Sequence, residues 1–305
     1  MKITTLHLHP QAPFDFQITA YSHGWIALLP NIWDDDKKTF QRTEKLTGGQ
    51  VVHINISGSE SWQQPEIKLD IQHQNDLSPE DNQEILKKIR CMLRLNEDLS
   101  EFYALCRKKG PQWQKVTQGA GRLLRSPTLF EDIIKTICTT NIQWGGTKRM
   151  VNGLVEHLGA AFPGKPSLKA FPTADVIANS PPETFTEIVR FGYRGPYIHQ
   201  LGRQVASGEL DLDTFLQKDI PTPEIKKRLL AIKGIGNYAA ATLLMILDRY
   251  DELAVDTVFR EFVRKKYFNG EKVSDEKTCQ VYQDWGQWKY LAYWFDIWQG
   301  LDETI

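Results

Sequence analysis

The chain has 305 residues, which is enough for two domains with hydrophobic cores of their own. Its composition, 41% apolar and 25% charged, is typical of a soluble globular protein. No stretch approaches ~20 consecutive apolar residues, the length that a membrane-spanning helix needs. The formal net charge of −1 excludes a strongly basic protein, although charges clustered on one surface could still contact phosphates.

The cysteines and the first residues bear on the cellular compartment. Cys91, Cys106, Cys138 and Cys279 lie far apart, which argues against a clustered iron–sulfur or zinc site and fits a reducing cytoplasm. The start, MKITTLHLHPQAPFDF, contains Pro and Asp and lacks the continuous apolar core of a signal peptide. We therefore expect a cytoplasmic protein.

Residues 1–77 show a pattern that is typical of antiparallel β-structure. Short alternating runs, separated by turn-rich or charged segments, indicate strands. These runs are FDFQITAY (14–21), WIALLP (25–30), QVVHINIS (50–57) and IKLDIQ (67–72).

From Ser78 onward almost every segment has the apolar spacing of a helix. Ser78-Pro79 and Ser126-Pro127 are each predicted to begin one, with serine as N-cap and proline at the first helical position. Further helices are expected at 146–158, 173–179, 182–190, 196–206, 222–232, 237–249, 256–267, 275–283 and 287–298. We therefore predict an α+β fold, with a small antiparallel β-rich N-terminal domain and its trailing helices over residues 1–108 and a helical core over 109–305.

The segment LLAIKGIGNYAAATLLMILDRYDELAVD (229–256) places a Gly-Ile-Gly corner between two helices. Gly234 and Gly236 allow a tight turn there. They leave amide N–H groups open at the N-terminus of the second helix, where the partial positive charge suits a phosphate. An ordinary helical hairpin is the alternative interpretation of a Gly-x-Gly corner alone.

Several motifs in a fixed order carry a family resemblance. The hairpin is followed by Val255-Asp256-Thr257, and the other motifs are GRLLRSP (121–127), FE (130–131), ICTTN (137–141), FGYR (191–194) and WGQW (285–288). Over residues 110–300 the chain resembles the helix-hairpin-helix (HhH-GPD) DNA glycosylases, and most of all the bacterial 3-methyladenine DNA glycosylase II branch and the 8-oxoguanine DNA glycosylases. The resemblance implies a two-part all-α core, a monomer, and double-stranded DNA with a damaged base as partner. It also implies a nucleoid-associated bacterial protein that does not contact a membrane.

For the hairpin, the resemblance implies DNA contacts from Lys233, Gly234, Ile235 and Gly236. It also places a monovalent cation, Na⁺ or K⁺, on the main-chain carbonyls of Leu230, Ile232 and Ile235. No iron–sulfur cluster or other cofactor is expected.

Asp256 is the candidate catalytic residue. Cleavage of an N-glycosidic bond builds positive charge on the sugar as the base leaves. A carboxylate fixed beside that sugar stabilises the charge and can orient or deprotonate a water. The alternative role is an N-cap of the helix that starts at Thr257, and both roles are compatible because the family's catalytic aspartate lies at such a helix start.

Tyr238 decides the expected type of reaction. In family members that also cleave the DNA backbone, a lysine at this position attacks the sugar and forms a Schiff base. A tyrosine cannot form that imine, and Lys233 lies on the other side of the corner. We therefore expect a monofunctional glycosylase without AP lyase activity.

The family's gap-filling residues correspond to Asn141 and Tyr193. A flat ring such as that of Tyr193 can wedge between base pairs, and Arg194 could read the orphaned base through its donors. The structural alternatives are a helix C-cap for Asn141, a loop aromatic over the core for Tyr193, and a surface ion pair for Arg194.

The substrate remains open between two branches. The FGYR segment and Asn141 resemble the 8-oxoguanine branch, but a cytosine-reading arginine of that branch falls at Gly146, its base-reading glutamine at Tyr293 and a pocket phenylalanine at Ile297. An aromatic set remains: Trp144, Tyr238, Tyr293, Trp294 and Trp298. Cationic alkylated purines stack well on such rings, although a core stripe at helical spacing is the alternative for Tyr290, Trp294 and Trp298.

We therefore predict a base excision repair glycosylase for alkylated purines such as 3-methyladenine, with Trp144, Tyr238, Tyr293 and Trp294 lining the base pocket. The alternatives are an 8-oxoguanine-type glycosylase and a non-catalytic protein that binds DNA or senses damage through the hairpin.

Overall fold

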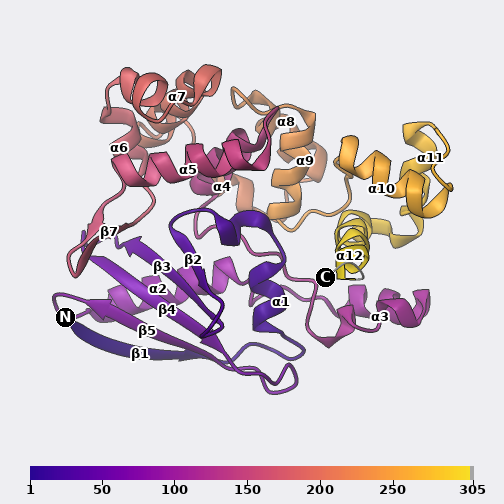
Figure 1. The fold of residues 1–305 in the computed structure, drawn as a ribbon, viewed down its shortest axis with the longest axis horizontal. Helices are drawn as coiled ribbons and strands as arrows, with labels where there is room; N and C mark the ends of the chain where they lie inside the picture. The colour runs from indigo at the N-terminus through magenta and orange to yellow at the C-terminus, as the bar shows by residue number, and fades with distance from the viewer. Residues whose placement is uncertain (303–305) are drawn as a thin grey trace. The chain divides into compact units, whose positions relative to one another are not determined.

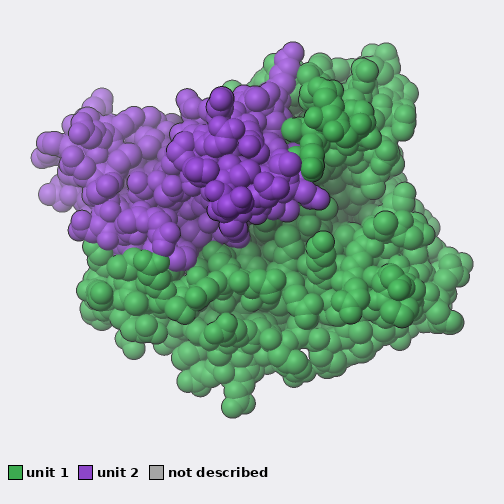
Figure 2. Space-filling view, turned by 180° about the vertical axis from the view of Figure 1, so that it is seen from behind, with its two compact units in different colours: residues 1–211 green, residues 212–305 purple. Residues whose placement is uncertain are grey.

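The computed structural model describes the backbone of residues 1–302 and the side chains through residue 297. The chain divides into two compact units, residues 1–211 and 212–305 (Figure 2). The change from strands to helices at Ser78 therefore falls inside the first unit. The predicted domain boundary at residue 108 does not coincide with the division between the units.

The first unit is built on a five-stranded antiparallel sheet with the strand order β1-β5-β4-β3-β2 (Figure 1). The strands are β1 (Lys2–Leu8), β2 (Asn31–Asp34), β3 (Thr39–Lys45), β4 (Val51–Gly58) and β5 (Ile67–His73). Alternate residues of β4 and β5 are fully buried, so one face of the sheet belongs to the core.

Two of the four predicted strands, β4 and β5, are confirmed. The other two are wrong. Residues 14–21 contain helix α1 (Phe16–Tyr21), and residues 25–30 contain most of the 3₁₀ turn η1 (Gly24–Ala27). The physical reason for α1 is its cap, because the carboxylate of Asp15 accepts a hydrogen bond from the N–H of Ile18 at 2.8 Å. Strands β1, β2 and β3 lie outside the predicted runs.

Helix α2 (Pro79–Met92) begins as predicted. Ser78 and Asp81 form a reciprocal capping box, and Pro79 occupies the first turn. The other helices of the first unit are α3 (Ser100–Lys109), α4 (Leu129–Thr139), α5 (Trp144–Leu158), α6 (Ala174–Asn179), the π-helix η4 (Thr184–Ile188), α7 (Gly195–Ala206) and the 3₁₀ turns Pro111–Trp113, Val116–Gln118 and Gly192–Arg194. A two-stranded hairpin, β6 (Ala161–Phe162) and β7 (Lys165–Lys169), interrupts this otherwise helical part.

The cap of α4 differs from the prediction. Thr128 is the N-cap, and its hydroxyl accepts a hydrogen bond from the N–H of Glu131 at 3.3 Å. Ser126 instead donates its N–H to the carboxylate of Asp132 at 2.8 Å and accepts a hydrogen bond from Lys135 at 3.3 Å. The Ser-Pro pair therefore belongs to the connection before α4 and not to the helix itself.

Four buried charged side chains connect β3 to α4. Arg42 donates to both carboxylate oxygens of Glu131, at 3.1 and 2.6 Å, and pairs with Glu44. Lys135 lies 2.6 Å from Glu131, and all four side chains are at most 7% exposed. We call Arg42, Glu44, Glu131 and Lys135 the buried ion cluster. Each charge has a partner, as burial requires.

The second unit is helical. It contains η6 (Leu212–Leu216), α8 (Thr222–Ala231), α9 (Asn237–Ile246), α10 (Thr257–Tyr267), α11 (Asp275–Gln280), η7 (Gln283–Trp288) and α12 (Lys289–Asp302), close to the predicted ranges. Residues 239–246 of α9 are all buried, so α9 is the central helix of this unit. Within the described residues, no helix combines the length and the apolar composition that crossing a membrane requires.

Candidate active site

The corner between α8 and α9 is a tight turn with an open helix N-terminus. Gly234 has φ = +95°, a conformation that favours glycine, and the N–H of Ile235 closes the turn on the carbonyl of Ile232 at 3.1 Å. Gly236 is the N-cap of α9, and no side chain caps this helix. The amides of its first turn are therefore available to an anion.

The surroundings of Gly236 leave room for that anion. Gly236 is exposed, and a Cβ added to it would meet no other group within 4 Å. Lys233, in the same corner, is exposed as well. The corner therefore combines available amides, open space and a nearby cation, which is the chemistry that a phosphate needs.

Asp256 is the N-cap of α10. Its Oδ1 accepts a hydrogen bond from the N–H of Phe259 at 2.7 Å, and the residue is half-buried. This bond holds the carboxylate at the start of α10. The second oxygen, Oδ2, can face a substrate or a water, so the structural role and the predicted catalytic role are compatible.

The negative charge of Asp256 acts on three tyrosine side chains. Burial first, and then the negative charge of Asp256, raise the pKa of Tyr238 and of Tyr293. Burial raises the pKa of Tyr290 well above 10, with smaller contributions from its tyrosine neighbours and from Asp256. All three phenols are therefore neutral. The negative potential that disfavours a phenolate anion at these positions favours a cation there.

The exposure of the predicted pocket residues separates them into two kinds. The ring of Tyr238 is 41% exposed, whereas Tyr293 is only 5% exposed. Tyr293 packs edge-on against Phe259 with ring centroids 4.8 Å apart. Trp294 is half-buried and lies 6.4 Å from the ring of Tyr290. Tyr238 is thus the accessible ring beside Asp256, and Tyr293 supports the site from the core. The side chain of Trp298 lies outside the described residues.

A buried carboxylate holds α10 against α12. Asp296 of α12 accepts hydrogen bonds from Lys266 at 2.7 Å, from Tyr267 at 2.6 Å and from Tyr282 at 2.7 Å. Lys266 and Tyr267 end the helix that Asp256 begins, and Asp296 is three residues from Tyr293. This contact therefore fixes Asp256 relative to Tyr293.

The carbonyls expected to hold a monovalent cation lie at the C-terminal end of α8 and in the corner. The last carbonyls of a helix lack helical partners, and neutral oxygens suit a hard monovalent ion. The carbonyl of Ile232 accepts one bond, from Ile235, and keeps a second lone pair. The monovalent cation on the carbonyls of Leu230, Ile232 and Ile235 stays a prediction. Among the side chains that the structure describes, no group of three His, Cys, Asp or Glu residues fits a metal ion.

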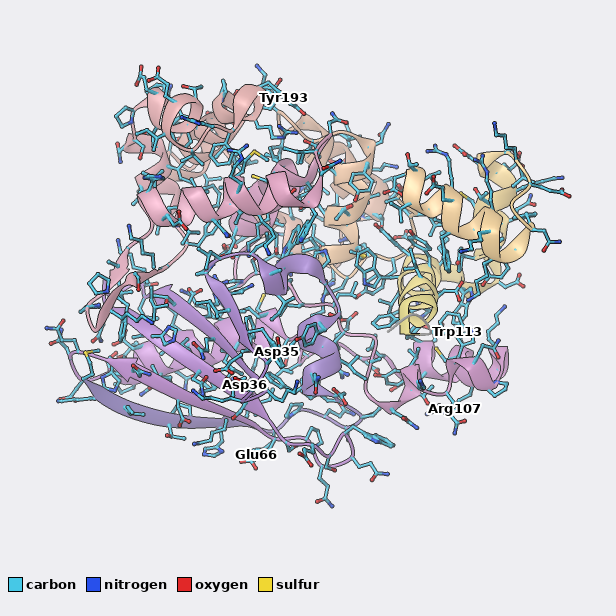
Figure 3. The ribbon with its side chains drawn as sticks, viewed as in Figure 1. Asp35, Asp36, Glu66, Arg107, Trp113 and Tyr193 are labelled. Carbon is cyan, nitrogen blue, oxygen red and sulfur yellow. The ribbon has the colours of Figure 1, made fainter. Side chains whose placement is uncertain are left out.

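A second group of predicted residues belongs to the first unit. Asn141 follows Thr140, the C-cap of α4, and has φ = +48°, so it is not itself the C-cap. Its side-chain nitrogen lies 3.4 Å from the hydroxyl of Tyr193, and Tyr193 is 53% exposed. The position of Tyr193 just before α7 can be followed in Figure 3. The structure thus brings together two predicted gap-filling residues that are 52 positions apart in the chain.

Arg194 differs from the expectation of an exposed reader of bases. It is only 5% exposed. Its Nη2 donates to the carbonyl of Thr140, and its guanidinium lies 4.4 Å from the centroid of the Tyr193 ring. The donors expected to face a base are turned into the protein.

Trp144 and Gly146 lie in the first turn of α5. The ring of Trp144 is 42% exposed, and its edge packs on Gly24, where an added Cβ would be 2.9 Å away. A Cβ at Gly146 would overlap with the side chain of Ile142. An apolar side chain therefore fills the space over Gly146, the position at which one branch of the family has its arginine.

Sequence reasoning anticipated one part of this arrangement and missed another. The N-cap role of Asp256 was among the expectations, and its bond to the N–H of Phe259 has N-cap spacing. The carbonyl of Thr140 as the partner of Arg194 has no such signal, because it is a backbone group brought close only by the tertiary fold.

Comparison with known proteins agrees with these features. Residues 134–287 match the family described as HhH-GPD superfamily base excision DNA repair protein. A DNA-3-methyladenine glycosylase of Bacillus subtilis (strain 168) is 25% identical over 239 residues, which cover 76% of this chain and 78% of the relative.

Two solved structures share the fold at low identity. The 3-methyladenine DNA glycosylase from Archaeoglobus fulgidus has a TM-score of 0.73 at 18% identity, over 96% of this chain and 98% of the other. The Clostridium acetobutylicum 8-oxoguanine glycosylase/lyase, in complex with double-stranded DNA that contains cytosine opposite 8-oxoguanine, has a TM-score of 0.71 at 17% identity, over 98% and 99%. At such identities the likeness concerns the fold, which the two activities share.

Proposed function

Because the chain belongs to the HhH-GPD superfamily of base excision DNA repair proteins, and is thereby a DNA glycosylase, we propose that it releases alkylated purines by hydrolysis alone. The observation that carries the proposal is the half-buried Asp256 carboxylate, whose negative charge acts on the accessible side chain of Tyr238. A purine that is alkylated on a ring nitrogen, as in 3-methyladenine, carries a positive charge while it is attached to DNA. It would stack on this electron-rich ring in a negative field.

The reaction follows from the same groups. As the base leaves, positive charge moves onto the sugar, and the fixed charge of Asp256 stabilises it. Oδ2 of Asp256 can orient a water for attack on that sugar, while Oδ1 stays bound to the N–H of Phe259. A cationic base is already a good leaving group, so the reaction needs no general acid. The raised pKa values of Tyr238 and Tyr293 make these phenols poor proton donors, which fits a reaction without a general acid.

The function is tested by chromatography of the released bases. The protein is incubated with methylated DNA and, separately, with a duplex that contains 8-oxoguanine opposite cytosine. We expect methylated purines from the first substrate and no 8-oxoguanine from the second. Release of 8-oxoguanine alone would assign the protein to the other branch. Binding of both DNAs without release from either would indicate a protein that only senses damage.

Hydrolysis without lyase activity gives a separate prediction. Borohydride should trap no covalent protein–DNA adduct, because Tyr238 stands where the lyase members of the family have their lysine. Strand breaks should appear only after alkali treatment of the product. An efficiently trapped adduct that disappears in Lys233→Ala would instead identify Lys233 as a nucleophile and refute the prediction.

The hairpin gives a prediction about DNA binding. Gly236→Val should weaken the binding of damaged and undamaged duplexes alike, since the new side chain blocks the approach of a phosphate to the α9 amides. The fold should tolerate the change, because an added Cβ meets nothing within 4 Å and the φ of −97° suits valine. Gly208→Ala is a control for adding a side chain at an open glycine away from the corner, and its positive φ of +76° makes it the more strained of the two substitutions. A loss confined to damaged DNA would place Gly236 in the base pocket.

A further inference from the structure

Four residues in two loops of the first unit form a closed ring of contacts. Asn141 reaches the hydroxyl of Tyr193 at 3.4 Å, the Tyr193 ring lies 4.4 Å from the guanidinium of Arg194, and Arg194 donates to the carbonyl of Thr140. Thr140 and Asn141 are consecutive, so the ring closes through the backbone. The loops come from the end of α4 and from the turn before α7.

Within this ring, Tyr193 and Asn141 are exposed and Arg194 is buried. Tyr193 is 53% exposed and Arg194 only 5%. The buried Nε of Arg194 finds no hydrogen-bond partner among the described residues. A buried guanidinium with an unsatisfied donor is costly, so its remaining contacts must compensate for that cost. Those contacts are made with the two loops that carry Asn141 and Tyr193.

We propose that Arg194 is a positioning residue that preassembles Asn141 and Tyr193 as one rigid wedge, and that it does not read the orphaned base. The proposal rests on the proposed function, since a wedge serves an enzyme that extrudes a nucleotide. A wedge that is ordered before DNA binds loses less conformational entropy on insertion. To reach a base, Arg194 would have to leave both Thr140 and the Tyr193 ring.

The neighbourhood of the wedge supports this assignment. Ile142, the residue after Asn141, is 37% exposed, and its side chain lies over Gly146. An apolar group offers no donor or acceptor with which to distinguish one base from another. With Arg194 turned inward and Ile142 beside the wedge, excision should depend on how easily the lesion unstacks and little on the identity of the opposite base.

The test separates positioning from reading. Arg194→Met keeps the length of the side chain but removes its donors and charge, and Arg194→Lys keeps the charge and N–H donors but loses the planar guanidinium. Arg203→Met, an exposed arginine on α7, is the matched control. Each variant is assayed on one alkylated base in single-stranded DNA and in duplexes with each of the four opposite bases.

For Arg194→Met we expect roughly tenfold slower excision from a stably paired duplex, the scale of losing a hydrogen bond from a charged group. The base should be released from single-stranded DNA at the normal rate, and the ranking of opposite bases should not change. Tyr193→Ala should give the same profile, and Arg194→Lys should lie between Arg194→Met and the wild-type protein. A changed ranking of opposite bases in Arg194→Met would overturn the proposal in favour of base reading. An equal loss of activity on every substrate would overturn the proposal too, and so would normal activity per folded molecule.

Fluorescence of 2-aminopurine at the target position gives a readout that does not depend on the substrate proposal. The wild-type protein should raise the fluorescence by extruding this base, and Arg194→Met should not. If no alkylated base is released but this difference remains, the substrate is wrong and the wedge stands. If alkylated bases are released and both proteins extrude 2-aminopurine equally, the wedge proposal is wrong and the substrate stands.

Discussion

Asp256→Asn is expected to slow base release by about 10²-fold or more, which corresponds to at least ~2.7 kcal/mol of lost transition-state stabilisation. The amide has nearly the same shape as the carboxylate but carries no charge. It can still accept the hydrogen bond from the N–H of Phe259, and asparagine is as good an N-cap as aspartate. The substitution thus removes the negative charge to which we assign the catalytic role and keeps the start of α10.

The measurement is single-turnover release of a methylated purine, with DNA affinity measured in parallel. Binding should be retained or become tighter, because a negative charge is removed near phosphates. Asp275→Asn is the matched control. Asp275 is exposed and pairs with Arg260, a side chain on which the charge of Asp256 also acts. Normal turnover in Asp256→Asn, or an equal loss in Asp275→Asn, would contradict the assignment of Asp256.

The parts of the fold that could be predicted depend on residues close to one another in the sequence. Ser78 and Asp81 form a capping box around Pro79 within four consecutive positions. The helices of the second unit follow from their apolar spacing. Residues 14–21 alternate like a strand, yet the cap at Asp15 and the burial of one helical face decide for a helix. In so short a run, apolar periodicity cannot distinguish a strand from a helix. The tertiary packing decides between them.

In the candidate site, too, the local features could be predicted and the tertiary contacts could not. The corner at Gly234 and the cap at Asp256 are local in sequence, and the structure has them where they were expected. The burial of Arg194 depends on a carbonyl 54 residues away, so no pattern in the sequence could indicate it. The separation of the exposed Tyr238 from the buried Tyr293 likewise depends on packing, since aromatic residues at helical spacing fit a pocket and a core equally well.

Arg42→Met is expected to lower the free energy of unfolding by about 3–5 kcal/mol, the usual cost of breaking a buried ion pair. Among the described residues, the change leaves Lys135 as the one cationic partner of Glu131, and it removes a donor from the side-chain oxygen of Asn31. Urea unfolding followed by circular dichroism measures the loss. Lys2→Met, in an exposed pair with Asp76, is the control and should cost less than about 1 kcal/mol. Equal effects of the two substitutions would show that the buried ion cluster does not stabilise the fold.

The same cluster predicts how this loss depends on pH. Burial would raise the pKa of Glu131, but Arg42 and Lys135 outweigh burial and lower it from 4.5 to about 2. A lowered carboxyl pKa stabilises the fold fully above 4.5, and this contribution is lost as the pH falls from 4.5 towards 2.

Burial also lowers the pKa of His23 from 6.5 to about 3, so the unfolded chain takes up a proton that the fold does not, and stability falls from pH 6.5 downward. The His23 contribution acts equally in both proteins, whereas the Glu131 contribution needs Arg42. The difference in unfolding free energy between the wild-type protein and Arg42→Met should therefore be constant from pH 7 to about 4.5 and shrink below it. A difference that stays constant down to pH 3 would show that Arg42 stabilises the fold by packing and not by its charge.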